Sequence, residues 1–386
     1  MNPGDTRPVD GVVDLLIIQA TPFCNLDCDY CYLPGRQSKE RITPAVLRKI
    51  FERAFASPLV GNEFTVVWHA GEPLAMPLAF YKEALTVVAE ENRRGISVRH
   101  SFQTNATLLT DEWCDFLLEN NLAIGVSVDG PAFLHDRHRK TRGGKGTWER
   151  VIGGMNRLTE HGVPFHVITV LTAESLDFPD ELFDFYREFG VRTICFNIEE
   201  IEGPHTSSTL SPGAAQERYA QFLDRFFDLV QQSGEKYAVR EFDSAMAAVL
   251  PTQPAMKYRG PQQTTPFGII SVDCRGNFST FSPELLGLPS DKYGDFSFGN
   301  VMTDSFESAL ESPKFQAVAR DVAAGVQRCE RTCEYFAFCG GGAPVNKLFE
   351  NGAFDSTETL FCRLTRKVPI DIVLRKATEH HGAVRA

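Results

Sequence analysis

Residues 21–32 read Thr-Pro-Phe-Cys-Asn-Leu-Asp-Cys-Asp-Tyr-Cys-Tyr, and the three cysteines of this segment are the most informative feature of the chain. Its cysteines, Cys24, Cys28 and Cys31, have the spacing CxxxCxxC and follow the apolar run 12–18, which predicts a buried strand. Three thiolates at this spacing can each bind one iron of a cubic [4Fe–4S] cluster. The fourth iron then has no protein ligand and is open to a substrate molecule, as in open metal sites generally.

The composition limits the class of protein. With 386 residues, 43% of them hydrophobic, the chain can bury a large core and form two domains. No apolar run approaches the roughly 20 residues that span a bilayer, and residues 1–8 lack the basic and apolar parts of a signal peptide. We therefore expect a cytoplasmic protein that contacts no membrane, and no separate leader-recognition domain before residue 12. The net charge of −11 argues against nucleic-acid binding.

Six strand-like apolar runs alternate with amphipathic helix-like runs between residue 12 and about residue 235. The expected strands are 12–20, 64–69, 98–104, 122–128, 164–171 and 193–197, and the expected helices are 44–56, 77–92, 111–120, 147–161, 179–189 and 212–232. Capping residues before Pro or acidic residues mark helix starts at Thr43, Thr110 and Ser211. Six βα units in succession predict a parallel sheet with helical crossovers.

The alternation stops after about residue 236. Residues 250–267 are rich in Pro, Gln, Thr and Gly and are typical of a linker. A strand pair at 268–273 and 277–281, a helix at about 306–324, a cysteine-rich stretch and a C-terminal helix follow. We therefore divide the chain into a first domain (1–235), a linker or bridging region (236–267) and a second domain (268–386).

The cysteine spacing, with the aromatic Tyr30 before the third cysteine, resembles the signature of the radical S-adenosylmethionine (radical SAM) superfamily. The resemblance implies an α/β fold, a partial (β/α)6 TIM-like barrel, with S-adenosylmethionine and one [4Fe–4S] cluster bound at the carboxyl ends of its strands. A structural zinc site and three unrelated buried cysteines are the alternatives. They are less favoured because zinc sites of the CxxC type have a second pair nearby, and the next cysteine here is Cys114.

The turn after the second expected strand resembles a cofactor-binding motif of this family. His69-Ala70-Gly71-Glu72-Pro73 is similar to the motif Gly-Gly-Glu-Pro, with Ala70 in place of the first Gly. Small residues such as Ala70 and Gly71 let the backbone approach the methionyl ammonium of the cofactor, and Glu72 adds negative charge. A simple turn with an exposed Glu72 is the alternative.

Polar residues also end the third and fourth expected strands, at Asn105 and Ser127. Both lie in motifs that resemble those of anaerobic sulfatase maturases, where a Ser at the position of Ser127 contacts the cofactor. Arg139 matches the family Arg that pairs with the methionyl carboxylate, for which a two-pronged guanidinium contact is well suited. Taken singly, each residue could equally be a hydrogen-bonding residue at a strand end.

A second group of cysteines, Cys329, Cys333, Cys339 and Cys362, lies near the C-terminus. It resembles the SPASM domain, a C-terminal extension that carries auxiliary iron–sulfur clusters in peptide-modifying radical SAM enzymes. Four cysteines ligate a cluster fully and leave no open iron, which suits electron transfer or a structural role. A structural zinc site is the alternative, because sites made of four cysteines bind either metal.

The second group departs from the family pattern. Cys329 and Cys333 are one residue further apart than the usual CxxC, and two other usual cysteine positions are Ala343 and Phe281. Most ligands of a first auxiliary cluster are therefore missing, and we expect one auxiliary [4Fe–4S] cluster rather than two. Cys274 is either a spare ligand or, as we favour, a buried free thiol.

The catalytic base has no firm candidate. In sulfatase maturases an Asp that acts as base follows the cysteine replaced by Phe281, and here that position is Ser282. Glu284 and Asp273 are nearby carboxylates and weak candidates, and either could be a solvated acid in a loop. The loss of the Asp counts against formylglycine formation.

The stretches 273–287, 339–352 and 357–360 look like those of the cyclophane-forming glycine-rich-repeat peptide maturases (GrrM/OscB type). The resemblance implies that a 5′-deoxyadenosyl radical removes a Cβ hydrogen from a ribosomally made precursor peptide. The carbon radical then adds to an aromatic ring, which loses an electron and a proton. An external reductant such as flavodoxin or ferredoxin is a further implied partner. The alternatives are another SPASM peptide oxidase, such as an anaerobic sulfatase-maturating (formylglycine-forming) enzyme, and a non-catalytic iron–sulfur protein.

Overall fold

A ten-stranded sheet forms the centre of the protein, in the order β12-β9-β8-β1-β2-β3-β4-β5-β6-β7. The computed structural model describes residues 11–211, 213–249 and 261–384. The first seven strands are β1 (Leu15–Ile18), β2 (Glu63–Trp68), β3 (Ser97–Thr104), β4 (Ala123–Ser127), β5 (Phe165–Leu171), β6 (Thr193–Ile198) and β7 (Ala238–Val239). Each of these strands runs parallel to the next. The parallel sheet is as the sequence predicts.

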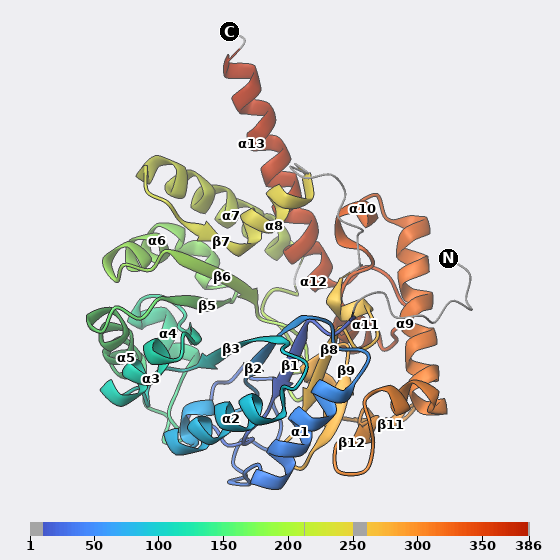
Figure 1. Ribbon diagram of the computed structural model, residues 1–386. Helices are drawn as coiled ribbons and strands as arrows, with labels where there is room; N and C mark the ends of the chain where they lie inside the picture. The colour runs from blue at the N-terminus through green and yellow to red at the C-terminus, as the bar shows by residue number, and fades with distance from the viewer. Residues whose placement is uncertain (1–10, 212, 250–260, 385–386) are drawn as a thin grey trace.

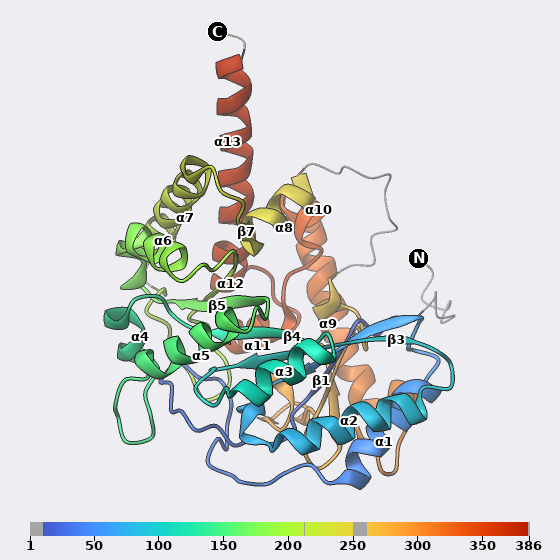
Figure 2. The ribbon, with the colours of Figure 1, turned by 60° about the vertical axis from the view of Figure 1, so that its left-hand side comes forward.

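Helices connect these strands and cover the outer face of the curved sheet (Figure 1 and Figure 2). They are α1 (Pro44–Ala56), α2 (Leu78–Glu91), α3 (Asp111–Glu119), α4 (Ala132–His138), α5 (Trp148–Glu160), α6 (Pro179–Glu188) and α7 (Ala214–Ser233). The six expected βα units are confirmed, and the short helix α4 between β4 and α5 is an addition that was not predicted. A successive βα arrangement of this kind gathers the carboxyl ends of all the strands at one rim.

Local sequence explains where several helices begin. The Thr43 hydroxyl accepts a hydrogen bond from the backbone N–H of Val46 at the start of α1, and Thr110 caps α3 in the same way. The expected cap at Ser211 is wrong, since Gly213 is the N-cap of α7 and no side chain caps that helix. Helix α1 turns Leu47, among others, onto the sheet, where it is fully buried.

Residues after 236 continue the sheet. The region expected to bridge the two domains contains β7 and helix α8 (Arg240–Val249), while its residues 250–260 lie outside the described residues. Strand β8 (Ile269–Val272) runs parallel to β1, and β9 (Asn277–Thr280) returns antiparallel to β8. Strand β12 (Gly299–Asn300) then closes that edge of the sheet. The strands that precede the second cysteine group therefore stand beside the strand that carries the first.

The C-terminal part is helical. It contains α9 (Pro313–Thr332), α10 (Phe336–Cys339), α11 (Pro344–Asn351), α12 (Leu360–Cys362) and α13 (Val368–Val384), after a small ribbon of β10 (Pro289–Ser290) and β11 (Gly294–Asp295). The helix expected at 306–324 starts later, because Ser312 caps α9 and Pro313 occupies its first turn. Helix α13 extends away from the body of the molecule (Figure 1). No helix in the described ranges is both long and apolar enough to cross a membrane.

Candidate functional site

The three cysteines of the first group lie in the loop after β1, at the rim where the parallel strands end. The loop backbone is held from outside: Arg36 donates to the Cys28 carbonyl at 2.9 Å, and Arg142 donates to the Cys24 carbonyl at 2.7 Å. Burial, with the charges of Glu72, Cys28 and Cys31, raises the pKa of the Cys24 thiol to about 12. Cys24 therefore interacts with both other thiols, and bound iron would stabilise all three as thiolates.

The chemistry of this donor set fits an iron–sulfur cluster. All three thiols are free and half-buried. Across the described part of the chain, no three His, Cys, Asp or Glu side chains are arranged to hold a single metal ion. Cluster ligands bind different irons and therefore stand further apart than the ligands of one tetrahedral zinc. Three thiolates that each bind a different iron of one cluster are compatible with this donor set.

The turn after β2 packs its backbone against the cysteine loop. Ala70 has a left-handed φ of +65°, and Gly71 has a φ of +124°. A Cβ on Gly71 would lie 2.2 Å from the carbonyl oxygen of Thr21, at the start of the cysteine loop. Ala70 thus occupies a conformation that glycine adopts more readily, which accounts for the glycine in the motif that this turn resembles.

Glu72 is buried and fully engaged within the protein. Its carboxylate accepts hydrogen bonds from the backbone N–H groups of Leu74 and Asn105 and from the Thr104 hydroxyl, at 2.9, 2.9 and 2.6 Å. Burial outweighs these bonds and raises its pKa to about 7. The alternative of a simple turn with an exposed Glu72 is therefore wrong. The residue ties the end of β3 to the turn after β2, and its contact with the cofactor stays a prediction.

Asn105 and Ser127 lie at neighbouring strand ends. The Asn105 amide donates to the Asn25 side chain at 2.9 Å and lies 3.8 Å from the Cys24 sulfur. Ser127 accepts a hydrogen bond from Gln103 at 2.9 Å. Asn105 therefore contacts the cysteine loop, whereas Ser127 lies at the end of the neighbouring strand β4. Asn25 was not predicted from the sequence, although it lies between two of the cysteines.

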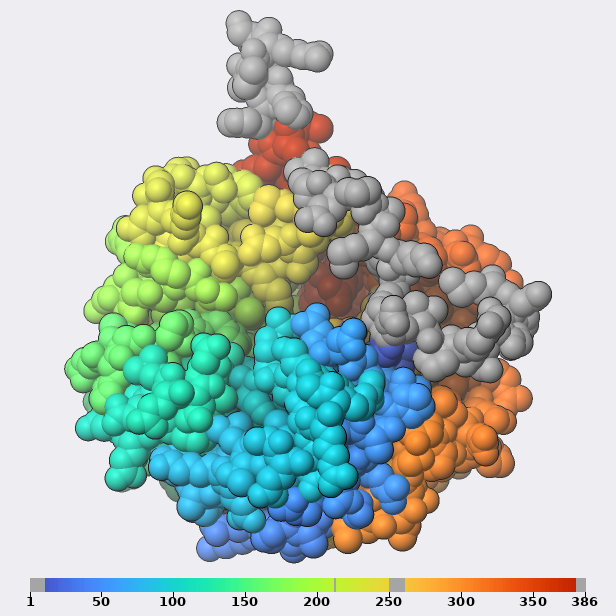
Figure 3. Space-filling view, in the orientation of Figure 1, coloured from blue at the N-terminus to red at the C-terminus, as the bar shows by residue number. Residues whose placement is uncertain are grey.

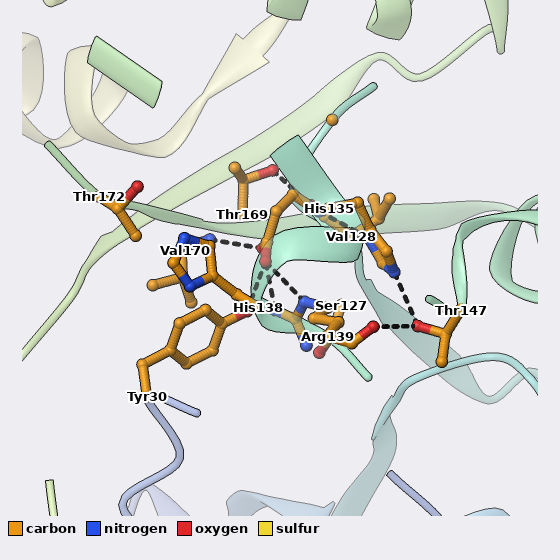
Figure 4. Close-up of polar contacts among 12 residues, drawn as sticks. Tyr30, Ser127, Val128, His135, His138, Arg139, Thr147, Thr169, Val170 and Thr172 are labelled. Carbon is orange, nitrogen blue, oxygen red and sulfur yellow. Dashed lines mark hydrogen bonds and ion pairs between the residues drawn. The ribbon is translucent and has the colours of Figure 1, made fainter. Parts of the chain in front are cut away.

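Arg139 holds a buried carboxylate of this chain. Its Nε and Nη2 donate to the two oxygens of Asp129 at 2.9 and 3.0 Å, and the Tyr30 hydroxyl donates to the same carboxylate (Figure 4). Burial raises the pKa of Asp129, but the Arg139 charge outweighs it and holds the pKa below its ordinary value. One edge of the guanidinium is therefore occupied, and a contact with the cofactor carboxylate, which stays a prediction, would fall to the other edge, formed by Nη1 and the second N–H of Nη2.

The four cysteines of the second group line one cavity. Cys329 lies in the last turns of α9 and Cys333 directly follows that helix, while Cys339 and Cys362 end the short helices α10 and α12. Burial, followed by the charge of Cys339, raises the pKa of the Cys362 thiol to about 12. Ala343, at a usual cysteine position, lines the same cavity. The structure thus brings together the four cysteines that the sequence singled out.

Two further residues at which the chain departs from the cysteine pattern, Phe281 and Cys274, are buried in the core. Phe281 is fully buried and its ring lies parallel to that of Phe315, with 6.2 Å between ring centroids. Cys274 is a buried free thiol in the turn between β8 and β9. Phe281 therefore leaves no donor at its position, and the number of auxiliary clusters stays a prediction.

A cavity with acidic walls opens between the barrel rim and the C-terminal helices. Glu200 and Glu202 follow β6, and Glu284 comes from the loop after β9; all three line the cavity. Figure 3 shows the surface hollowed beside the yellow surface of α8, with the red C-terminal segment at the base of the hollow. Burial raises the pKa of each of the three carboxyls, that of Glu200 to about 7. Glu200 and Glu202 were not predicted, although the string Glu-Glu-Ile-Glu directly after a strand was a signal.

The two weak candidates for the base lie in different surroundings. Glu284 lines the acidic cavity and accepts a hydrogen bond from Ser282. Asp273 instead closes the turn between β8 and β9, where its carboxylate accepts from the backbone N–H groups of Arg275 and Asn277 at 2.9 Å each. The Asp273 carboxylate is therefore hydrogen-bonded within the turn. Of the two candidates, only Glu284 lines the acidic cavity.

Comparison with known proteins agrees with this geometry. Residues 18–186 match the family model described as the radical SAM superfamily. The chain is 44% identical over 376 residues to the uncharacterized protein sll1766 of Synechocystis sp., covering 96% of this chain and 94% of the relative. It is 28% identical over 347 residues to the serine-type anaerobic sulfatase-maturating enzyme of Bacteroides thetaiotaomicron, covering 84% and 80% of the two chains.

Two solved structures share the fold. The chain is similar to native anSMEcpe with bound AdoMet and Cp18Cys peptide, with a TM-score of 0.77 and 21% identity over 96% of this chain and 99% of the other. It is also similar to Streptococcus suis SuiB bound to the precursor peptide SuiA, with a TM-score of 0.63 and 15% identity over 91% and 76%. The chain has the radical SAM fold, and its residues 18–186 match the radical SAM superfamily, whose members bind S-adenosylmethionine and a [4Fe–4S] cluster.

Proposed function

We propose that this protein is a radical SAM peptide maturase that joins a side-chain Cβ of a ribosomally made precursor peptide to an aromatic ring, forming a cyclophane. The observation that carries the proposal is the place of the acidic cavity between the two cysteine groups. Tyr32, next to Cys31, lies within electrostatic reach of Glu202 and Glu284. On the other side, Phe338 and Phe361 line the cavity, and each adjoins a cysteine of the second group.

The proposal keeps the cluster ligands and the cofactor-binding residues that the sequence predicts. Cys24, Cys28 and Cys31 hold the radical SAM cluster, and S-adenosylmethionine is held along the rim by the set Tyr30, Ala70, Gly71, Glu72, Asn105, Ser127 and Arg139. When bound, the cluster and S-adenosylmethionine supply the 5′-deoxyadenosyl radical that removes a hydrogen atom. The chain itself orients the peptide in the cavity and keeps water from the radical.

Cys329, Cys333, Cys339 and Cys362 hold one auxiliary [4Fe–4S] cluster in this proposal, beyond the far wall of the cavity. After ring closure the peptide must lose one electron and one proton to restore aromaticity. A cluster held by these four cysteines would supply the electron acceptor, and the Glu284 carboxylate takes the proton from the ring carbon. Glu284 suits this role because it lines the cavity and its pKa is raised by burial, so that it holds a proton more readily than a solvated carboxylate does.

Formylglycine formation is the second candidate function, since a sulfatase-maturating enzyme is among the similar proteins. The position of the Asp that acts as base in those enzymes is here Ser282, which is buried and donates a hydrogen bond to Glu284. Glu284 reaches the same neighbourhood from two residues further along the chain. This substitution favours a reaction on a different substrate over oxidation of Ser or Cys.

The test is anaerobic co-expression with each short peptide encoded beside the gene, followed by mass spectrometry of the peptide. Cyclophane formation predicts loss of two hydrogen atoms and a ring segment that resists fragmentation between the joined residues. Oxidation of Ser to formylglycine also removes two hydrogen atoms, so a hydrazide probe for aldehydes is needed to separate the two. An aldehyde without a cross-link would overturn the cyclophane proposal and establish the second candidate.

A further inference from the structure

A buried lysine reaches into the second cysteine group. Lys347 of α11 is only 3% exposed, and its Nζ lies 3.3 Å from the Cys329 sulfur, to which it donates a hydrogen bond. It lines the same cavity as the four cysteines. Within the described chain no carboxylate forms an ion pair with Lys347, whereas Lys367, which also lines this cavity, pairs with Glu358.

A buried ammonium beside a neutral thiol is poorly compensated, because removing a charge from water is costly unless an opposite charge or strong hydrogen bonds replace the water. A thiolate-ligated [4Fe–4S] cluster provides that opposite charge at this position. The surroundings of Lys347 therefore fit an anionic cluster held by Cys329 and its three partners.

Reduction adds one electron to the cluster and makes it more negative. A positive charge and a hydrogen bond at a ligating sulfur stabilise the reduced form more than the oxidised form, and this raises the reduction potential. We propose that Lys347 sets the potential of the auxiliary cluster and so makes it a ready electron acceptor. This inference rests on the proposed function, since it requires an iron–sulfur cluster at the four cysteines.

The neighbouring residue on the same helix connects this site with the acidic cavity. The Asn346 amide donates to Glu200 at 2.7 Å and to Glu202 at 3.3 Å. Helix α11 therefore contacts two carboxylates of the cavity wall through Asn346 and the cysteine group through Lys347. The charge of Lys347 would therefore act on the proposed electron acceptor. It lies one residue along the helix from Asn346, which contacts the wall of the acidic cavity.

The experiment uses the full chain with Cys24, Cys28 and Cys31 replaced by Ala, so that the auxiliary cluster is the only one left. The midpoint potential of this cluster is measured by a reductive titration followed by electron paramagnetic resonance. Lys347→Met removes the charge and should shift the potential to a more negative value. Lys347→Arg keeps the charge and should restore it. Lys367→Met is the matched control, with a smaller shift expected because Glu358 already offsets that charge.

The outcomes separate the two proposals. An intact cluster whose potential is the same in the parent chain and in Lys347→Met would overturn the role of Lys347. If Lys347→Met loses iron, Lys347→Gln replaces it, since Gln keeps an N–H donor without the charge, and a parent-like potential in Lys347→Gln would overturn the role of the charge. A parent chain that holds zinc and no iron would instead overturn the auxiliary cluster of the proposed function, and the inference would fall with it.

Discussion

Arg139 and Asp129 form a bidentate ion pair in which both partners are buried, with 8% and 4% of their side chains exposed. The pair joins the end of α4 to the segment after β4, and Tyr30 of the cysteine loop donates a hydrogen bond to its carboxylate. The side chain expected to bind the cofactor is thus fixed in place by an acid of the same chain. Positioning by such a pair gives Arg139 little freedom to turn, which suits a contact of defined geometry.

The first prediction concerns this pair. Asp129→Asn leaves the Arg139 guanidinium buried without its countercharge and should destabilise the metal-free chain by about 3–5 kcal/mol. Arg139→Lys should lower both the stability and the affinity for S-adenosylmethionine, because one ammonium cannot replace the two-pronged contact. Urea denaturation and calorimetric binding to the reconstituted protein measure the two effects.

Arg137→Lys is the control for these variants, since Arg137 pairs with Glu174 at the surface with 61% of its side chain exposed. Its stability should stay within about 1 kcal/mol of the parent chain. If Asp129→Asn proved as stable as Arg137→Lys, the pair would not fix Arg139 in the way described.

The second prediction concerns the turn after β2. Gly71→Ala places a Cβ 2.2 Å from the Thr21 carbonyl and should cost at least about 1–3 kcal/mol while displacing the cysteine loop. Ala70→Gly should change stability by less than about 1 kcal/mol, because relief of the left-handed conformation is offset by greater freedom of the unfolded chain. The iron content after reconstitution and the urea midpoint should both fall for Gly71→Ala only. Equal behaviour of the two variants would show that the turn does not contact the loop closely.

The third prediction tests the ligands of the first cluster. Cys24→Ala, Cys28→Ala and Cys31→Ala should each abolish formation of 5′-deoxyadenosine, because each leaves the cluster without one of its three protein ligands. Reconstitution should give about eight irons in the parent chain and about four in the triple variant. Cys195→Ala, in strand β6, is the control and should keep the parent values. A triple variant that still cleaves S-adenosylmethionine would overturn this assignment.

Much of the barrel could be predicted from sequence, since each βα unit shows its own apolar period and capping residues within a short window. Relationships across the chain could not. The Asn346 contact with Glu202 spans 144 residues, and a single lysine on an amphipathic helix such as α11 is typical of a solvent-exposed position. The start of α9 was misplaced because the 3-10 turn Glu307–Glu311 extends the helical pattern before Ser312. The two cysteine groups were identifiable because their spacing is local.

The fourth prediction concerns pH. In the proposed function Glu284 acts as the base in its carboxylate form, and burial raises its pKa above the ordinary value for Glu. The ratio of cross-linked peptide to 5′-deoxyadenosine should therefore fall on acidification, and the fall should begin at a higher pH than an ordinary Glu would give. Glu284→Gln should lower the ratio at every pH and flatten the profile. Asp273→Asn is the control, because its carboxylate serves the turn between β8 and β9; loss of the ratio in Asp273→Asn alone would move the base to Asp273.

The fifth prediction separates the two cysteine groups. Cys339→Ala removes one proposed ligand of the auxiliary cluster, while the first group, which lies in the loop after β1, stays complete. Cleavage of S-adenosylmethionine should therefore persist, and cross-linking should fall because the closed ring has lost its electron acceptor. Both products are measured in the same folded sample, with circular dichroism as the check on folding. Parent-like amounts of both products would show that the cluster is dispensable. Loss of soluble protein, repeated in the milder Cys339→Ser, would mean that the four thiolates act by holding the C-terminal helices together.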